Sequence, residues 1–158
     1  MIKLNLIIDG NYIVNKLAFI FKGERSFYVD YPAALRKDLE RALKLYQFDN
    51  IYFISDSKSS WRKRFFNEYK GDRKKDEELD WNFIFESYDE FKEEIKQTKN
   101  INFYQINELE GDDIIAYLTK ETNKFGYSNF IITNDRDIHQ LLEFSTSKNY
   151  INIIYNFK

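Results

Sequence analysis

The sequence predicts an α/β domain with a mainly parallel sheet of about five strands, flanked by helices. Short apolar runs rich in Ile, Phe and Tyr alternate along the chain with stretches of helical periodicity. Hydrophobic residues make up 43% of the chain and charged residues 32%, which is typical of a globular protein. A length of 158 residues suits one core, so we expect a single domain over residues 1–158.

The predicted strands are short and consist of the residue types that buried strands favour. Helical stretches lie between them, which is the arrangement expected of a parallel sheet. The five strands are expected at residues 4–8, 51–54, 101–106, 130–133 and 150–155.

Each predicted helix carries an apolar stripe at helical spacing, and we expect core packing to explain every stripe. Pro32 shortly precedes the first stripe, which suits the start of a helix. Gly111-Asp112-Asp113 opens the last helix with acids that its macrodipole favours, and Gly126 closes it. The four stripes lie within residues 35–46, 61–69, 81–95 and 114–122.

The composition excludes several classes of site. The chain has no Cys, which rules out disulfides and thiolate metal sites and favours a reducing compartment. His139 is the single histidine, so no zinc site can be built from several imidazoles. The net charge of −2 gives no global sign of nucleic-acid binding. The apolar run at residues 17–21 is far shorter than the ~18 residues of a membrane span, so we expect a cytosolic protein.

Acidic residues fall at the ends of the predicted elements. Three strands run directly into aspartate, and a fourth acidic cluster opens the helix that follows the third strand. Because the carboxyl ends of parallel strands lie along one edge of a sheet, we expect these side chains to be neighbours there. The seven carboxylates are those of Asp9, Asp56, Glu110, Asp112, Asp113, Asp135 and Asp137.

So many carboxylates in one place need cations or raised pKa values to offset their repulsion, which is about 4 kcal/mol for two charges ~4 Å apart at an effective dielectric constant near 20. Oxygen ligands without Cys favour hard ions, so we expect Mg²⁺ or Mn²⁺. Two such ions ~3.5–4 Å apart are the arrangement of phosphodiester hydrolysis. For a single acid, helix capping is the alternative, in particular for Asp113 and Asp137.

A basic segment follows the second acidic strand end. Residues 61–75 contain seven basic and two acidic residues, a local balance of +5, with aromatic residues between them. Such a segment suits a polyanionic substrate, although charge runs are more often solvated helix faces.

These pieces together resemble the 5′-nuclease superfamily, in particular the phage and bacterial 5′→3′ exonucleases and flap endonucleases. The family's motifs occur in its order, from Asp9-Gly10-Asn11 to the acids of residues 133–137 and then Gln140-Leu141. Between them, Trp61-Arg62 follows Asp56, and a tyrosine-lysine-x-x-arginine element spans residues 69–73.

The resemblance implies a PIN-like three-layer core holding two Mg²⁺ or Mn²⁺ ions. Asp137 would serve the second ion or sit between the two, and Asp9 and Asp56 would be close or water-mediated ligands. The implied ligands of the first ion are Glu110, Asp112, Asp113 and Asp135.

The resemblance also implies that the partner is DNA with a 5′ flap, nick or single-stranded 5′ end. Lys70 and Arg73 would contact the scissile phosphate, and Tyr69 would stack on a base. The family's helical arch would fall at about residues 72–90, although the apolar stripe from residue 81 favours an ordinary packed helix. Further substrate-binding residues would be Arg62, Arg64 and Lys74.

The chain departs from the family at its end. Family members continue into a helix-hairpin-helix-like region that grips duplex DNA, whereas this sequence stops at Lys158. Three explanations stay open: the sequence is a fragment, a separate polypeptide supplies this part as a partner, or this is a minimal version. A PIN-type ribonuclease and a non-catalytic DNA-binding subunit remain alternatives, and a Mg²⁺-binding receiver domain is a more distant one.

Overall fold

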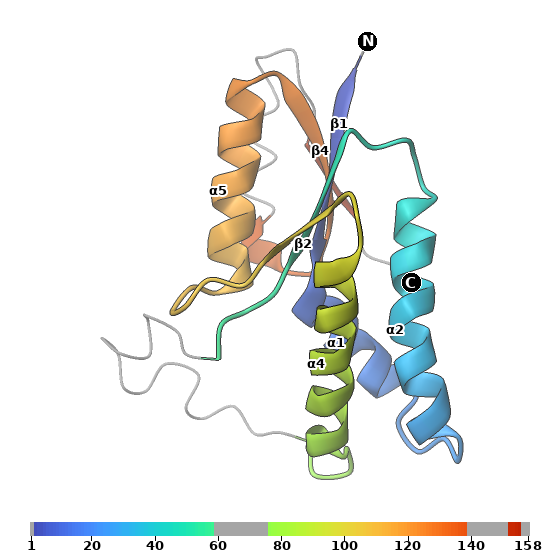
Figure 1. Cartoon of the computed structure of the whole chain (residues 1–158). Helices are drawn as coiled ribbons and strands as arrows, with labels where there is room; N and C mark the ends of the chain where they lie inside the picture. Colours follow the sequence, from blue (N-terminus) through green and yellow to red (C-terminus); the bar gives the residue numbers. More distant parts are fainter. Residues whose placement is uncertain (1, 59–75, 139–151, 156–158) are drawn as a thin grey trace.

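The computed structural model describes residues 2–58, 76–138 and 152–155, and it shows a three-layer α/β fold (Figure 1). Five parallel strands form one sheet in the order β3-β2-β1-β4-β5. The predicted fold class is therefore confirmed. In chain order the elements are β1 (Lys3–Asp9), α1 (Gly10–Ile20), α2 (Phe27–Leu43), β2 (Asn50–Ile54), α4 (Trp81–Gln97), β3 (Ile101–Tyr104), α5 (Gly111–Lys124), β4 (Tyr127–Ile132) and β5 (Asn152–Tyr155).

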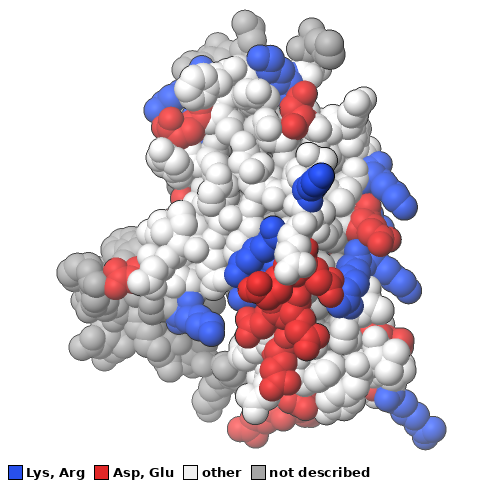
Figure 2. All heavy atoms as spheres, in the orientation of Figure 1, with Lys and Arg blue, Asp and Glu red and all other residues white. Residues whose placement is uncertain are grey.

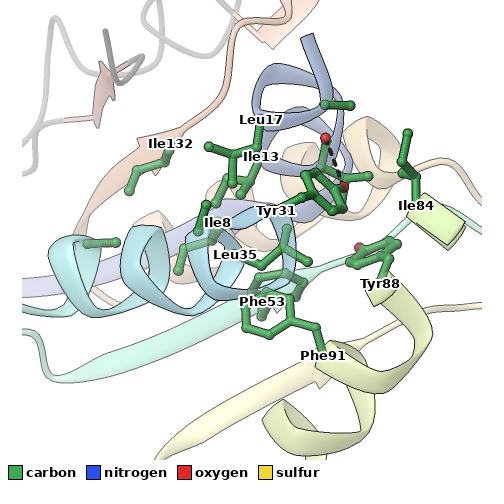
Figure 3. Close-up of a cluster of buried hydrophobic side chains, with 14 of the residues drawn as sticks. Ile8, Ile13, Leu17, Tyr31, Leu35, Phe53, Ile84, Tyr88, Phe91 and Ile132 are labelled. Atoms are coloured by element: carbon green, nitrogen blue, oxygen red, sulfur yellow. Dashed lines mark hydrogen bonds between the residues drawn. The ribbon is translucent and has the colours of Figure 1, made fainter. Parts of the chain in front are cut away.

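The two faces of the sheet are covered by different helices. Alternate residues of a strand point to opposite faces, so Leu6 and Ile8 of β1 pack with α1, α2 and α4, whereas Ile7 packs with α5. The larger core contains stacked and edge-on aromatic rings, and in it the Tyr31 hydroxyl donates to the Val14 carbonyl at 3.2 Å (Figure 3). These two cores fix the sheet between the helix layers.

Helix α1 is absent from the helices that the sequence predicts. Its buried residues, Ile13, Val14, Leu17 and Ala18, do follow helical spacing. The apolar run at residues 17–21 obscures that pattern, because it continues past the last buried position to the exposed Phe19 and Ile20. The helix begins immediately after β1, so the chain turns back over the sheet without an intervening loop.

The start of α2 was predicted wrongly. Pro32 lies inside the helix, which begins at Phe27, instead of preceding it. A proline lacks the N–H for one helix hydrogen bond, but the extra turns bury Phe27 and Tyr31, whose rings stack with centroids 5.2 Å apart. That burial outweighs one missing bond. At the other end, Tyr46 lies beyond the helix and is 58% exposed.

The remaining predicted elements are present with shifted ends. Strand β3 ends at Tyr104, two residues before its predicted end, and β4 begins three residues early. Of the predicted arch, residues 72–75 lie outside the described residues, and residues 81–90 belong to α4, which buries Ile84 and Tyr88 against the sheet. The stripe at residues 61–69 also lies outside the described residues. Within the described ranges, no helix has both the length and the apolar run for crossing a membrane.

The strand order reverses between β1 and β4. From β1 the chain proceeds to β2 and β3 on one side, and it returns to the other side of β1 with β4 and β5. In open α/β sheets such a reversal leaves a crevice at the carboxyl ends of the two strands, where ligands bind. Asp9 and residues 133–137 lie at this place.

Asparagines form a ladder across the amino-terminal half of the sheet. Asn5 pairs in register with Asn50 and with Asn129, and Asn129 pairs with Asn152. Their side-chain amides donate from one strand to the next, from Asn50 to Asn5 (3.0 Å), from Asn5 to Asn129 (3.2 Å) and from Asn129 to Asn152 (3.2 Å). Asn123 of α5 bonds to the last member. This row, which is buried except at the half-buried Asn50, ties four strands and one helix together.

Candidate metal centre

Asp9 ends β1 and also caps α1. Its Oδ1 accepts a hydrogen bond from the Tyr12 N–H at 3.3 Å, which satisfies one free donor of the first helical turn. Its Oδ2 accepts from the Thr133 hydroxyl at 2.7 Å, across the crevice between β1 and β4. Gly10 permits this turn, because a Cβ there would lie 2.5 Å from Cε1 of Phe53. The packing of α1 thus holds Asp9 at the carboxyl edge.

The environment of Asp9 disfavours the negative charge of its carboxylate. The pKa of Asp9 is raised from 3.8 to about 6, with burial as the largest cause and the carboxylates of Asp56 and Asp135 acting in the same direction. The hydrogen bonds from Thr133 and Tyr12 act in the opposite direction. A cation placed nearby would relieve this penalty.

Asp56 follows β2 and lies against the start of α5. Its Oδ1 accepts a short hydrogen bond from the Gly111 N–H, and its own N–H donates to Oδ1 of Asn11 at 2.9 Å. A Cβ on Gly111 would lie 2.8 Å from that Asp56 oxygen, so the glycine leaves room for the contact. These bonds join the end of β2 to the first turns of α1 and α5.

The first turn of α5 brings its acids together. Asp113 Oδ2 accepts from the Glu110 N–H at 3.1 Å, so the capping role considered for Asp113 is present. Capping does not remove it from the acidic cluster, because a carboxylate oxygen of each of Glu110, Asp112 and Asp113 lies within 4.8 Å of the others. Glu110 is buried, and its two neighbours are half-buried.

A second group of three carboxylates shares Asp112 with the first. Oxygens of Asp112, Asp135 and Asp137 also lie within 4.8 Å of one another. The turn after β4 shapes this group, because Asp135 N–H donates to the Thr133 hydroxyl at 3.1 Å and Asp137 N–H donates to Asp135 Oδ1 at 2.9 Å. Acids from α5 and from the β4 end, 23 residues apart in the case of Asp112 and Asp135, thus meet at one edge.

Each predicted acid lies at the expected edge of the sheet, but they do not form one shell. Asp9 and Asp56 lie outside both groups of three. Asp135 groups with Asp137 and Asp112, whereas the resemblance implied Asp135 with the acids of residues 110–113. The predicted basic and aromatic residues, Arg62, Arg64, Tyr69, Lys70, Arg73 and Lys74, lie outside the described residues.

The sequence assigned no role to the residues that hold these acids in place, although Asn11 and Thr133 lie within the motifs that carry the resemblance. Thr133 supports Asp9 and Asp135, and Asn11 supports Asp56. Tyr88 of α4 reaches the same region, since its hydroxyl donates to Ser55 Oγ at 2.8 Å. In the sequence Tyr88 shows only as one member of an apolar stripe, and burial raises the pKa of its phenol, which keeps it a neutral donor.

The donor set fits hard divalent cations. It consists of carboxylate oxygens in two groups that share one residue, at a crevice where burial and mutual repulsion already disfavour negative charge. Oxygen ligands of this kind suit Mg²⁺ and Mn²⁺. The arrangement could therefore concentrate positive charge beside a bound anion.

Comparison with known proteins identifies both a sequence family and a fold that this chain shares. Residues 4–156 match the family model described as 5′-3′ exonuclease, N-terminal resolvase-like domain. The 5′-3′ exonuclease of Mycoplasmopsis pulmonis is 31% identical over 146 residues, which cover 87% of this chain and 45% of that protein. The Ribonuclease H of Enterobacteria phage T4 is 30% identical over 121 residues, which cover 74% of this chain and 40% of that protein.

A solved structure of the bacteriophage T5 flap endonuclease, a pseudo-enzyme-product complex with DNA and metal ions, has the same fold. It matches with a TM-score of 0.66 and 22% identity over 97% of this chain and 55% of that chain. The chain thus spans about half the length of these relatives. The predicted resemblance is confirmed: the chain belongs to the family of 5′-3′ exonuclease N-terminal, resolvase-like domains.

Proposed function

We propose that this chain is the catalytic domain of a divalent-metal-dependent 5′ nuclease that hydrolyses phosphodiester bonds in DNA. The observation that carries the proposal is the pair of three-carboxylate groups sharing Asp112 at the crevice between β1 and β4. The membership of the family and the DNA and metal ions in the complex of the T5 relative support it.

Two Mg²⁺ or Mn²⁺ ions are the proposed cofactors. The group of Glu110, Asp112 and Asp113 would hold one ion, and that of Asp112, Asp135 and Asp137 the other. When bound, such ions supply Lewis acidity to a water molecule and to phosphate oxygens. Asp9 and Asp56 add negative charge to the same edge and, through their hydrogen bonds, fix the strand ends that carry the ligands.

The basic element supplies the proposed substrate contacts. Lys70 and Arg73 would stabilise charge that develops on the scissile phosphate, Tyr69 would stack on a base, and Arg62, Arg64 and Lys74 would bind the strand. The support is their place in the sequence, because the segment that carries them comes between Asp56, which follows β2, and the start of α4.

The 5′ end of DNA, as a flap, a nick or a single strand, is the proposed substrate. Grip on duplex DNA would come from the further part that longer relatives have, either in a continuation of this chain or in a separate polypeptide. The phage relative named Ribonuclease H favours testing an RNA strand as the second candidate.

Cleavage of a labelled 5′-flap DNA in the presence of Mn²⁺ tests the proposal. We expect EDTA-sensitive cleavage near the base of the flap, because the carboxylates need cations to approach phosphate. The same flap made of RNA distinguishes a deoxyribonuclease from a ribonuclease. Tight binding of the flap without any metal-dependent cleavage would refute the catalytic proposal and favour a DNA-binding subunit.

Two variants test the assigned residues. Asp135→Asn should weaken Mn²⁺ binding, measured by calorimetry, about tenfold or more, whereas Asp30→Asn serves as a control, because Asp30 is an exposed acid of α2 that belongs to neither carboxylate group. Lys70→Ala should slow cleavage and leave Mn²⁺ binding intact, with Lys37→Ala as its control. Unchanged Mn²⁺ affinity removes Asp135 from the ligands, and normal cleavage removes Lys70 from the substrate contacts.

A further inference from the structure

A cavity of about 430 Å³ opens beside Asp56, on the side of the sheet covered by α4. Its walls are the turn after β2, the first turn of α1, the middle of α4 and Gln105, which follows β3. The volume falls within the ~300–1,000 Å³ of small-ligand sites. The cavity is thus large enough for one flat organic group next to the metal centre.

Phe85 gives this cavity an aromatic wall. The apolar stripe of α4 predicts Phe85 in the core, but the structure leaves 42% of it exposed. The Trp81 ring supports it, with centroids 5.8 Å apart and planes inclined by 31°, and Trp81 Nε1 donates to the Asp76 carbonyl at 2.7 Å. An exposed ring held in this way is a fixed surface on which a planar group can stack.

The charges around the cavity balance. Its lining contains two lysines, Lys58 and Lys92, and two aspartates, Asp56 and Asp89. Lys92 is only 8% exposed, and its ammonium lies 3.1 Å from Asp89 Oδ1 and 4.7 Å from the centre of the Tyr88 ring. Because the protein already satisfies that charge, the cavity favours a neutral polar group over a phosphate.

The outer surface of α4 also disfavours a phosphate on this side. Figure 2 shows acidic side chains gathered over the lower part of this face, where α4 lies in Figure 1. Like charges repel a polyanionic backbone, so the sugar-phosphate chain would keep away from α4 and lie nearer the cations of the metal centre. The exposed acids of the helix are Glu86, Asp89, Glu90, Glu93 and Glu94.

We infer that this cavity receives one nucleobase of the bound strand, stacked on Phe85, from a nucleotide next to the cleaved bond. The inference rests on the proposed function. Asp56 links the two places, since it lines the cavity and its carboxylate bonds to Gly111 at the start of the acidic turn. A base in the cavity would hold its own phosphate beside the carboxylate groups and so set the position of the cut.

Abasic substrates test the inference. A set of 5′-flap DNAs, each with a tetrahydrofuran residue at one position within two nucleotides of the cut, is compared with the intact flap. For one position, kcat/KM of the wild type should fall about tenfold, and Phe85→Ala should lower kcat/KM about tenfold on the intact flap. The abasic flap and Phe85→Ala together should lower kcat/KM no more than either change alone, because both remove the same stacking contact.

Two further variants serve as controls. Phe85→Tyr keeps the ring and should behave like the wild type on every flap. Phe125→Ala removes a ring that is 74% exposed at the end of α5, outside the cavity, and should retain the full abasic penalty. Two results would refute the base pocket and leave the nuclease proposal standing. One is a fall of about a hundredfold in kcat/KM for Phe85→Ala on the abasic flap, relative to the wild type on the intact flap. The other is an unchanged kcat/KM of the wild type on every abasic flap.

The same comparison can be made on binding alone. Dissociation constants of the intact and abasic flaps are measured in Ca²⁺ for wild type and Phe85→Ala. Suppose that no flap is cut in Mn²⁺, that the abasic change and Phe85→Ala each weaken binding, and that the two together weaken it no more than either alone. The base pocket then stands and the nuclease proposal fails. If binding shows no abasic effect, or penalties that multiply, the pocket is refuted whatever happens to cleavage.

Discussion

Asp9→Asn should stabilise the metal-free protein at neutral pH. Burial, with a smaller contribution from neighbouring carboxylates, raises the pKa of Asp9 from 3.8 to about 6, a difference of about 2. Each unit corresponds to about 1.4 kcal/mol, so the ionised carboxylate lowers the free energy of unfolding by at most about 3 kcal/mol above pH 7. Asp9 is half-buried, and the water that reaches it makes this value a ceiling. Asn has the same shape without the charge.

The sign follows from proton linkage. Below the ordinary pKa both the folded and the unfolded chain hold the proton, so the carboxylate costs nothing there. As the pH rises from 3.8 to about 6, the unfolded chain releases its proton more readily, and the wild type loses stability that Asp9→Asn keeps. Urea denaturation in EDTA, at pH values from about 4.5 to about 7.5, should show the difference between the two proteins growing with pH.

A variant of opposite sign controls the experiment. Asp80 caps α4, and the N–H of Phe83 and the hydroxyl of Tyr28 lower its pKa, so Asp80→Asn should destabilise the protein at neutral pH. Added Mn²⁺ should narrow the difference between the two proteins, because binding adds about 2.7 kcal/mol to the folded wild type at a hundredfold excess over Kd, and the loss of the Asp9 charge weakens that binding in Asp9→Asn. Equal or lower stability of metal-free Asp9→Asn near pH 7.5 would refute the argument that its charge is disfavoured.

Three further predictions concern single contacts. Gly111→Ala should weaken Mn²⁺ binding about tenfold in calorimetry, because the new Cβ would lie 2.8 Å from an Asp56 oxygen and displace it. The protein should still fold, because the Asp56 side chain can rotate away. An unaltered Mn²⁺ affinity would contradict this prediction. Tyr88→Phe should lower the free energy of unfolding in urea by about 1–2 kcal/mol through loss of the bond to Ser55, and a change within error would show that the bond contributes nothing. Thr119→Val should raise it by about 1 kcal/mol, since the buried Thr119 hydroxyl has no hydrogen-bond partner among the described residues; a loss of stability would point to a partner for that hydroxyl.

The sequence predicted the acidic edge because two local rules combine there. Strand ends are readable from apolar runs, and parallel strands bring their carboxyl ends together whatever their separation along the chain. Asp9, Asp56 and Asp135 therefore appear at the expected edge. Their grouping depends on helix turns and side-chain bonds, so the sharing of Asp112 between two groups could not be predicted.

Features that depend on tertiary packing were missed or predicted wrongly. Pro32 reads locally as a helix start, but contacts of Phe27 and Tyr31 with the core extend α2 in front of it. Phe85 has the spacing of a core residue, yet the neighbouring helices leave its ring in the cavity wall. In both cases, residues distant in sequence decide the outcome.

The asparagine ladder helps to fix the register of the strands. A slip of one residue in β5 would turn Asn152 away from Asn129 and put an isoleucine in its place, leaving buried amides without partners. Stacked asparagines of the same kind zip amyloid strands together, but here the row is confined to four strands and ends on a helix. The ladder lies at the opposite end of the strands from the acids. Substitutions among the acids can therefore change the metal centre while the asparagines keep the strands in register.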